Sequence, residues 1–373
     1  MPLLLGNFIE SRALRGGIMG LDNLLAVLLI PVIGAWSDRV RSPLGQRLPF
    51  IAVGMPAAAL LFALLPLNQT RLVSLLALDI VFLLAMTLYR APVIALMPDH
   101  TPEEKRSTAN GIINLMGGIG GLLAFFVLAP LYDLNTSYPF MLGAVLLLLT
   151  FFFLFTVTDR HPPYTAPIGE GEEASNFTKL FSDIGSLRAP EHRQARFILL
   201  AIFLYSLGFG GLEAQFSTYA TEGLGLSGGQ AGLLLGFFSL AFVVMALPAG
   251  LIGSRIGKAP AMLLGLGALS VLFGLMFTFQ LPAALRIFLI LAGLSWALIN
   301  VQAYPLVADM GDKTRIGFFT GMYYLFSMSA SIIAPALMGL GMDLFGPSSL
   351  FVLAGLAMLL GCLSLWQGKR VQL

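Results

Sequence analysis

Charged residues are scarce in this sequence. Only 11% of its 373 residues are Asp, Glu, Lys or Arg, whereas 57% are hydrophobic. A soluble domain carries about 25% charged residues, most of which lie on its water-facing surface. Because a chain of this length with so little charge cannot cover such a surface, we predict an integral membrane protein.

Cysteine and histidine are also nearly absent. The single cysteine, Cys362, excludes a disulfide framework and any Cys-based zinc or iron-sulfur site. The three histidines, His100, His161 and His192, fall in polar stretches, which argues against a histidine metal site within the membrane. The net charge is +2 and no long basic run is present, so nucleic acid is not an expected partner. We expect no metal and no cofactor.

Apolar stretches of about 20 residues, the length of a helix that crosses a bilayer, recur along the whole chain. They are too long and too uniformly apolar for β-barrel strands, which alternate over about 10 residues. We therefore predict an all-α membrane bundle. The expected spans are residues 17–36, 50–67, 73–97, 109–131, 138–158, 197–220, 230–252, 260–280, 283–307, 317–342 and 348–367.

The Lys and Arg residues between these spans indicate an orientation. Sixteen fall on one side, and only Arg12, Arg15, Arg71 and Arg286 fall on the other. The positive-inside rule then places the C-terminus in the cytoplasm. We expect the membrane to be the cell (inner) membrane. We expect an N-terminal membrane half at 1–158, a cytoplasmic linker at 159–196 and a C-terminal membrane half at 197–373. Eleven crossings place the N-terminus outside, so we interpret residues 1–10 as the outer end of a largely missing first helix.

Two features repeat about 210 residues apart. Each half has a glycine, three residues, a short polar residue and an arginine, and each half later has an aspartate followed by basic residues. A carboxylate beside arginines can form charge-assisted hydrogen bonds that hold one conformation of a bundle. The alternative is that the basic residues only enforce topology. The gating residues that we expect on the cytoplasmic side are Gly34, Asp38, Arg39, Gly45, Arg47, Asp99, Arg106, Arg255, Gly257, Lys258, Asp309 and Arg315.

The first of these signatures resembles the loop between helices 2 and 3 of the major facilitator superfamily. More narrowly, the stretches DNLLAVLLIPVIGAWSDR, YRAPVIALMPDHTPEEKRSTANGIINLMGGIGG and AYPLVADM resemble the branch of sucrose and maltose proton symporters and glycoside and hexuronide cation symporters. This resemblance implies a bundle of two pseudo-repeated six-helix halves that rock about a central cavity. The chain departs from it in showing five plus six helices and in having Ser254 where the first half has Asp38.

Four ionisable residues fall within the expected spans: Asp22, Asp79, Arg90 and Glu213. Such residues are costly in a membrane and generally mark pathways. Asp79 and Arg90 share nearly one helix face but lie roughly 16 Å apart along the axis, so Arg90 needs a carboxylate on another helix or the substrate. Coupling to protons requires a carboxylate, for which Asp22, Asp79 and Glu213 are the candidates. A merely solvated, interfacial carboxylate is the alternative for Asp22 and Glu213.

Trp296, Asn300 and Tyr304 recur every four residues along one predicted helix. Sugar recognition uses planar rings against the sugar face and amides on its hydroxyl groups, so this stripe is a candidate sugar contact. An aromatic stripe at helical spacing can equally be packing. In the sixth span, Tyr205 and Gln215 are further candidates beside Glu213.

With the resemblance, these features predict a secondary active transporter rather than an enzyme. Its expected partners are the lipid bilayer, a small polar solute and protons, and its expected mechanism is proton-coupled sugar symport by alternating access. An efflux carrier for organic compounds and a non-transporting, receptor-like relative of the same fold are the alternatives.

Overall fold

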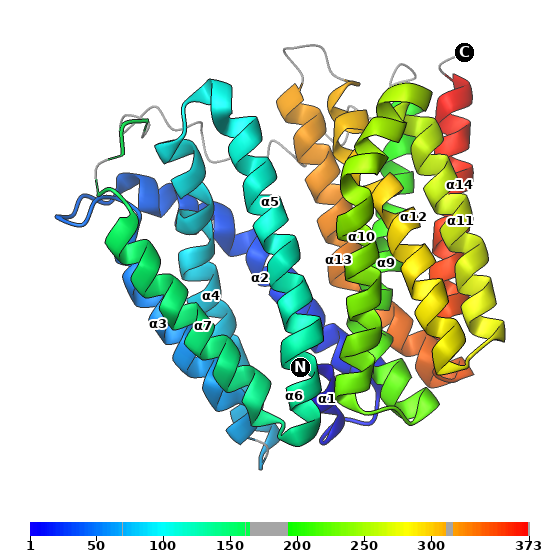
Figure 1. The fold of residues 1–373 in the computed structure, drawn as a ribbon, viewed down its shortest axis with the longest axis horizontal. Helices are drawn as coiled ribbons and strands as arrows, with labels where there is room; N and C mark the ends of the chain where they lie inside the picture. The colour runs from blue at the N-terminus through cyan, green and yellow to red at the C-terminus, as the bar shows by residue number, and fades with distance from the viewer. Residues whose placement is uncertain (69, 161, 165–192, 311–315, 372–373) are drawn as a thin grey trace. The chain divides into compact units, whose positions relative to one another are not determined.

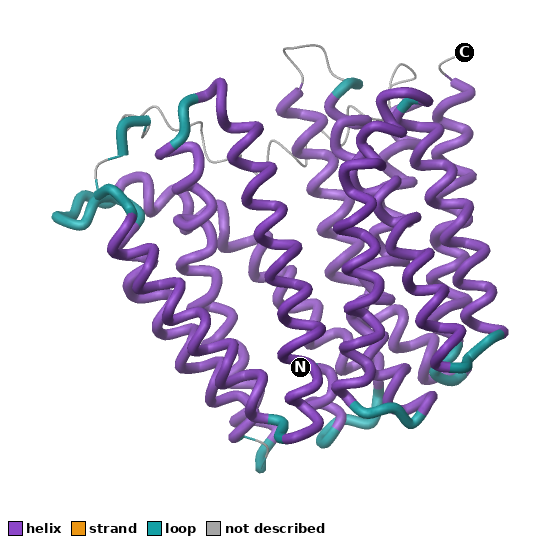
Figure 2. Tube along the Cα trace, viewed as in Figure 1, coloured by secondary structure: helices purple, strands orange, loops and turns teal. Residues whose placement is uncertain are grey.

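The computed structural model describes residues 1–68, 70–160, 162–164, 193–310 and 316–371. Within these residues, eleven helices are long and apolar enough to cross a membrane, and no strand is present (Figures 1 and 2). All eleven predicted spans are confirmed, and with them the all-α membrane fold.

The chain divides into two compact units. One comprises Met1–Leu21 and Phe177–Leu373, and the other comprises Asp22–Asn176. The boundary at Leu21 falls inside helix α2 (Arg12–Arg39), so the first turns of α2 pack with the second half of the sequence. We call the units the C-terminal unit and the N-terminal unit. Most of the linker expected at 159–196 lies outside the described residues.

In the N-terminal unit, α3 packs against both α4 and α7 (Figure 1). Leu48, Ile51 and Met55 of α3 are buried in this contact. A π-helical turn joins α5 to α6, so these elements form one continuous rod. Besides α2, the helices of this unit are α3 (Leu48–Leu64), η1 (Leu65–Leu67), α4 (Leu72–His100), η2 (Glu103–Lys105), α5 (Arg106–Leu123), η3 (Ala124–Leu128), α6 (Ala129–Leu134) and α7 (Ser137–Val157).

In the C-terminal unit, α9 packs against α13 and α14, while α12 packs against α10 and α11 (Figure 1). The core between them is filled by large side chains that are fully buried, among them Phe216, Phe273 and Phe351. The helices are α1 (Pro2–Gly6), the start of α2, α9 (Arg193–Thr218), η5 (Tyr219–Gly223), α10 (Gly228–Ile256), α11 (Lys258–Thr278), α12 (Pro282–Ala308), α13 (Ile316–Phe345) and α14 (Ser349–Val371).

Glycines bring the start of α2 into backbone contact with α13. A Cβ atom at Gly16 would collide with the backbone oxygen of Pro335, and one at Gly20 would meet that of Ile332. From the other side, a Cβ atom at Gly339 would collide with the backbone of Arg12. Small residues allow membrane helices to approach this closely, so the first turns of α2 form part of the C-terminal unit.

Candidate functional site

Three of the four ionisable residues expected within spans belong to the N-terminal unit. Asp22 lies on α2, and Asp79 and Arg90 lie on α4. Among the described residues, Asp22 is within electrostatic range of Arg90 and of Asp79, but it makes no ion pair with Arg90. Asp79 is buried, at 8% exposure, whereas Arg90 is exposed. Asp22 is thus a carboxylate on a different helix from Arg90, as the sequence predicts for a partner of this arginine. We call Asp22, Asp79 and Arg90 the membrane charge group.

The Trp296 stripe has a buried part and an exposed part, both in the C-terminal unit. Trp296 is 6% exposed and stacks on Phe209, with ring centroids 3.7 Å apart and an interplanar angle of 11°. Its edge contact with Tyr205 completes an aromatic wall between α9 and α12. Asn300 and Tyr304, one and two turns further along α12, are exposed. The polar residues of the stripe are therefore exposed, whereas Trp296 is part of the packing between α9 and α12.

The polar candidates on α9 separate in the same way. Glu213 is exposed. Gln215 is fully buried, and its amide donates to the backbone oxygens of Arg12, at 3.1 Å, and Pro335, at 2.9 Å. Gln215 therefore joins helices α2, α9 and α13 and is unavailable to a solute in this conformation.

Arg47 is the centre of the first of the two repeated signatures. Its Nε donates to Asp99 Oδ2 at 3.0 Å, and its Nη1 donates to Ser37 Oγ at 2.6 Å and pairs with Asp38. The Asp99 side chain is 8% exposed and the Asp38 side chain is 48% exposed, so one partner is buried and the other is solvated. Arg47 and Asp99 also line a cavity of about 190 Å³ with Arg160.

The other members of this signature surround that centre. Gly45 has a φ of +83°, and a Cβ atom there would collide with the Arg160 backbone oxygen, so the turn requires glycine. Arg106 donates to the backbone oxygens of Pro98 and Thr101 at 3.4 Å each. Gly34 makes only ordinary contact with α4, and Arg39 is exposed.

The second signature repeats the central pair in the C-terminal unit. Lys258 pairs with Asp309 and also donates to the Pro305 backbone oxygen at 3.4 Å. Gly257, with a φ of +94°, forms the turn between α10 and α11. Arg255 is exposed, and Arg315 lies outside the described residues. Both halves thus join a cation after the glycine turn to an aspartate at the end of a later helix. Ser254 donates to its own helix, so this signature lacks the pair that Asp38 makes.

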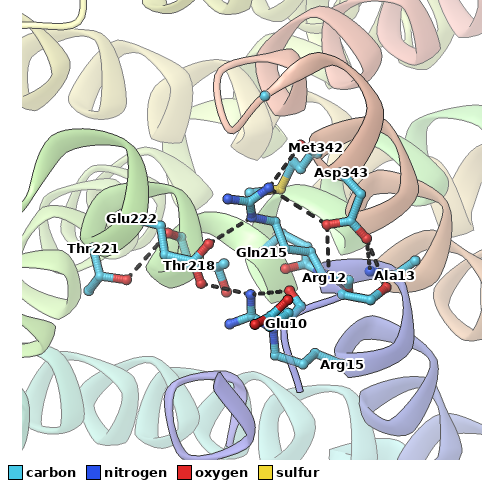
Figure 3. Close-up of polar contacts among 12 residues, drawn as sticks. Glu10, Arg12, Ala13, Arg15, Gln215, Thr218, Thr221, Glu222, Met342 and Asp343 are labelled. Atoms are coloured by element: carbon cyan, nitrogen blue, oxygen red, sulfur yellow. Dashed lines mark hydrogen bonds and ion pairs between the residues drawn. The ribbon is translucent and has the colours of Figure 1, made fainter. Parts of the chain in front are cut away.

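A second charge cluster was missed in the sequence. Arg12 and Arg15, which we had counted only for topology, both pair with Glu222 of η5, and Arg12 also approaches Asp343 of α13 (Figure 3). The arginines are three residues apart on one helix, and the carboxylates stand at the ends of two other spans. The arginine spacing was a usable signal, but the sequence alone does not show that those helix ends meet.

Comparison with known proteins places this geometry in context. A family model described as MFS/sugar transport protein matches residues 9–357. The tetracycline resistance protein, class E, of Escherichia coli is 26% identical over 273 residues, which are 71% of this chain. That match covers 64% of the relative, so less than two thirds of its length.

Solved transporter structures share the fold. A mutant of the nucleoside transporter NupG superposes with a TM-score of 0.75 at 16% identity, covering 98% of this chain and 94% of that one. A D-xylose-proton symporter gives 0.70 at 14% identity, covering 98% and 90%. The human organic anion transporter MFSD10 gives 0.64 at 21% identity, covering 95% and 84%. At these identities the likeness concerns the fold alone.

Proposed function

Because the chain belongs to the MFS/sugar transport protein family and is a membrane transporter rather than an enzyme, we propose that it carries a sugar together with protons. The proposed mechanism is alternating access across the inner cell membrane, with the C-terminus in the cytoplasm. The observation that supports coupling best is the membrane charge group, because Asp22 on α2 and Asp79 and Arg90 on α4 are ionisable residues within spans of one unit, and Asp79 is buried. Charges in such positions are costly and are kept for a function.

The proposed coupling works through the charge state of Asp22. When Asp22 is ionised, it offsets the positive charge of Arg90. When Asp22 takes up a proton, Arg90 loses that partner and its guanidinium can donate to solute hydroxyl groups instead. Proton binding and solute binding then favour each other, and this reciprocal coupling is what a symporter requires. Asp79, which is buried in the same unit, is the second candidate carboxylate.

For the solute, we propose that α12 of the C-terminal unit contributes Asn300 and Tyr304. Both side chains are exposed and lie on one stripe, and the Tyr304 hydroxyl lies 3.4 Å from Thr320 Oγ1. Amide and hydroxyl groups can satisfy sugar hydroxyls that leave water. Trp296 holds the stripe in place through its stacking on Phe209, and Glu213 is the further polar candidate on α9.

For gating, we propose that the two cytoplasmic signatures hold one conformation and release it during transport. Arg47 with Asp99, and Lys258 with Asp309, are the contacts that would break. Their repetition in both halves supports this role over one in topology alone, because topology would need only the cations.

The test is uptake of a radiolabelled disaccharide into proteoliposomes under an inward proton gradient. Asp22→Asn should lower the gradient-driven accumulation of sugar at least tenfold. The variant should still exchange labelled for unlabelled sugar, because exchange needs no net proton movement. Glu104→Gln, which removes a carboxylate from an exposed position outside the spans, should leave both rates unchanged. Accumulation by D22N equal to that of the unaltered protein would contradict the assignment of Asp22.

Efflux of organic compounds is the second candidate, supported by the 26% identity to the tetracycline resistance protein. It predicts that no sugar in a panel is taken up above the level of protein-free vesicles, and that a proton gradient drives tetracycline out of loaded vesicles. The two candidates therefore differ in both substrate and direction.

A further inference from the structure

The first turn of α2 is held by η5, which follows α9, and by the carboxyl-terminal end of α13 (Figure 3). Glu222 Oε2 accepts from Arg12 Nε at 2.7 Å, and Glu222 Oε1 lies 2.7 Å from Arg15 Nη2. One carboxylate thus uses each of its oxygens for a different arginine. We call Arg12, Arg15, Glu222 and Asp343 the Arg12 cluster.

Asp343 binds the same turn through the backbone. Its Oδ1 accepts from the Arg12 N–H at 3.0 Å, and its Oδ2 accepts from the Ala13 N–H at 3.0 Å and from the Ser11 hydroxyl at 2.8 Å. These are N–H groups that a helix leaves without partners inside itself. A carboxylate at this end also interacts favourably with the helix dipole. Asp343 therefore caps α2 from a different helix.

The charges of the cluster balance and remain close to water. Two arginines face two carboxylates, so separating them exposes equal numbers of positive and negative charges. The Arg12, Glu222 and Asp343 side chains are 20%, 32% and 23% exposed, so solvent already reaches them. Only Arg15, at 3%, is fully covered. The pairs that Arg12 makes with Glu222 and Asp343 are partly exposed on both sides and can be exchanged for hydration at modest cost.

Unpartnered polar atoms gather at the same place. In the described part of the chain, five buried side-chain nitrogen or oxygen atoms have no hydrogen-bond partner. Three of them belong to Arg15, Gln215 and Thr218. Buried polar groups in a permanent contact are almost always paired, so this gathering requires an explanation. Water entering an opened contact would satisfy all three.

We propose that the Arg12 cluster is a releasable clamp. It holds the start of α2 against α9 and α13 in the conformation described, and it opens when the transporter exposes its solute at this end of the C-terminal unit. The proposal rests on the proposed function for the purpose of the opening, but the opening itself needs no transported solute. Arg12, Arg15, Glu222 and Asp343 are positioning residues, because they set the place of α2.

Thr218 offers a direct probe of the opening. Its side chain is fully buried and lies next to the cluster (Figure 3). In purified protein with Cys362→Ser and Thr218→Cys, the rate of alkylation by a polar maleimide measures how often water-soluble reagents reach this position. Glu222→Gln and Asp343→Asn should each raise that rate at least tenfold. Glu10→Gln is the matched control, because Glu10 meets the cluster through its backbone oxygen, and it should leave the rate unchanged.

Equal labelling rates in E222Q, D343N and the parent would overturn the clamp, as would an equal increase in E10Q. Each variant is first checked for a single elution peak in detergent, and Arg12→Lys replaces any carboxylate variant that does not fold. Lysine keeps the charge but lacks the guanidinium that reaches both Glu222 and the Met342 backbone oxygen, so R12K should also label faster. Faster labelling together with no flux of sugar or drug would leave the clamp standing and refute the proposed function alone.

Discussion

Removing the positive charge of Arg47 should destabilise the N-terminal unit far more than removing either of its two carboxylate partners. Arg47 donates to Asp99, whose side chain is 8% exposed, and pairs with Asp38, whose side chain is 48% exposed. Arg47→Gln leaves the Asp99 carboxylate buried without a cation. Breaking a buried pair in this way costs about 3–5 kcal/mol.

The two carboxylate variants should cost less, and for different reasons. Asp99→Asn retains an oxygen that can accept from Arg47 Nε but loses the charge, so about 1–3 kcal/mol is expected, the range for a hydrogen bond to a charged group. Asp38→Asn removes a pair that is half exposed and screened, which is worth about 0–1 kcal/mol. The expected order of destabilisation is therefore R47Q, then D99N, then D38N.

Thermal unfolding in detergent measures this order. A loss of 1 kcal/mol lowers Tm by about 2–4 °C in a domain of this size, so R47Q should fall by on the order of 10 °C and D38N by at most about 4 °C. If the first signature acts in gating as we propose, Asp38→Asn should nevertheless slow transport while the protein remains in the membrane. A Tm for D38N as low as that for R47Q would refute the argument from burial.

Three further substitutions, one of them with a matched control, test contacts within the C-terminal unit. Gly16→Ala should lower stability by about 1–3 kcal/mol, because the added Cβ atom collides with the Pro335 backbone oxygen. Gly17→Ala, which has open space around it, should be neutral or slightly stabilising. Equal melting temperatures of the two variants would contradict the close approach of α2 and α13. Trp296→Ala should cost about 3–5 kcal/mol through loss of its buried aromatic stack, and a shift in Tm of less than 2 °C would show that the ring is not packed. Lys258→Gln should cost less than about 1 kcal/mol, since its pair is 33% and 63% exposed, and chemical unfolding that showed more would point to a buried role.

The eleven spans were predictable because hydropathy and length are local properties of the sequence. Their ends were less so. The first span was expected at 17–36, whereas α2 covers Arg12–Arg39. The charged residues at both ends continue the helix beyond its apolar part: Arg12 and Arg15 pair with Glu222 at one end, and Arg39 is exposed at the other.

The internal repeat predicted which residues of the two halves correspond to each other. Offsets of about 210 residues linked Arg47 with Lys258 and Asp99 with Asp309, and the structure joins each cation to its own aspartate. The partners of Glu222 and Asp343 had no such signal. Their contacts depend on which helix ends meet, and this is set by packing between residues more than 200 positions apart.

The cap on α2 also affects how the protein is made. Asp343 closes the first turn of a helix that begins 331 residues earlier in the chain. During synthesis, the N–H groups of Arg12 and Ala13 leave the ribosome long before the carboxylate that binds them, since domains are made from the N-terminus onward. The start of α2 therefore cannot reach its final structure until α13 has entered the membrane.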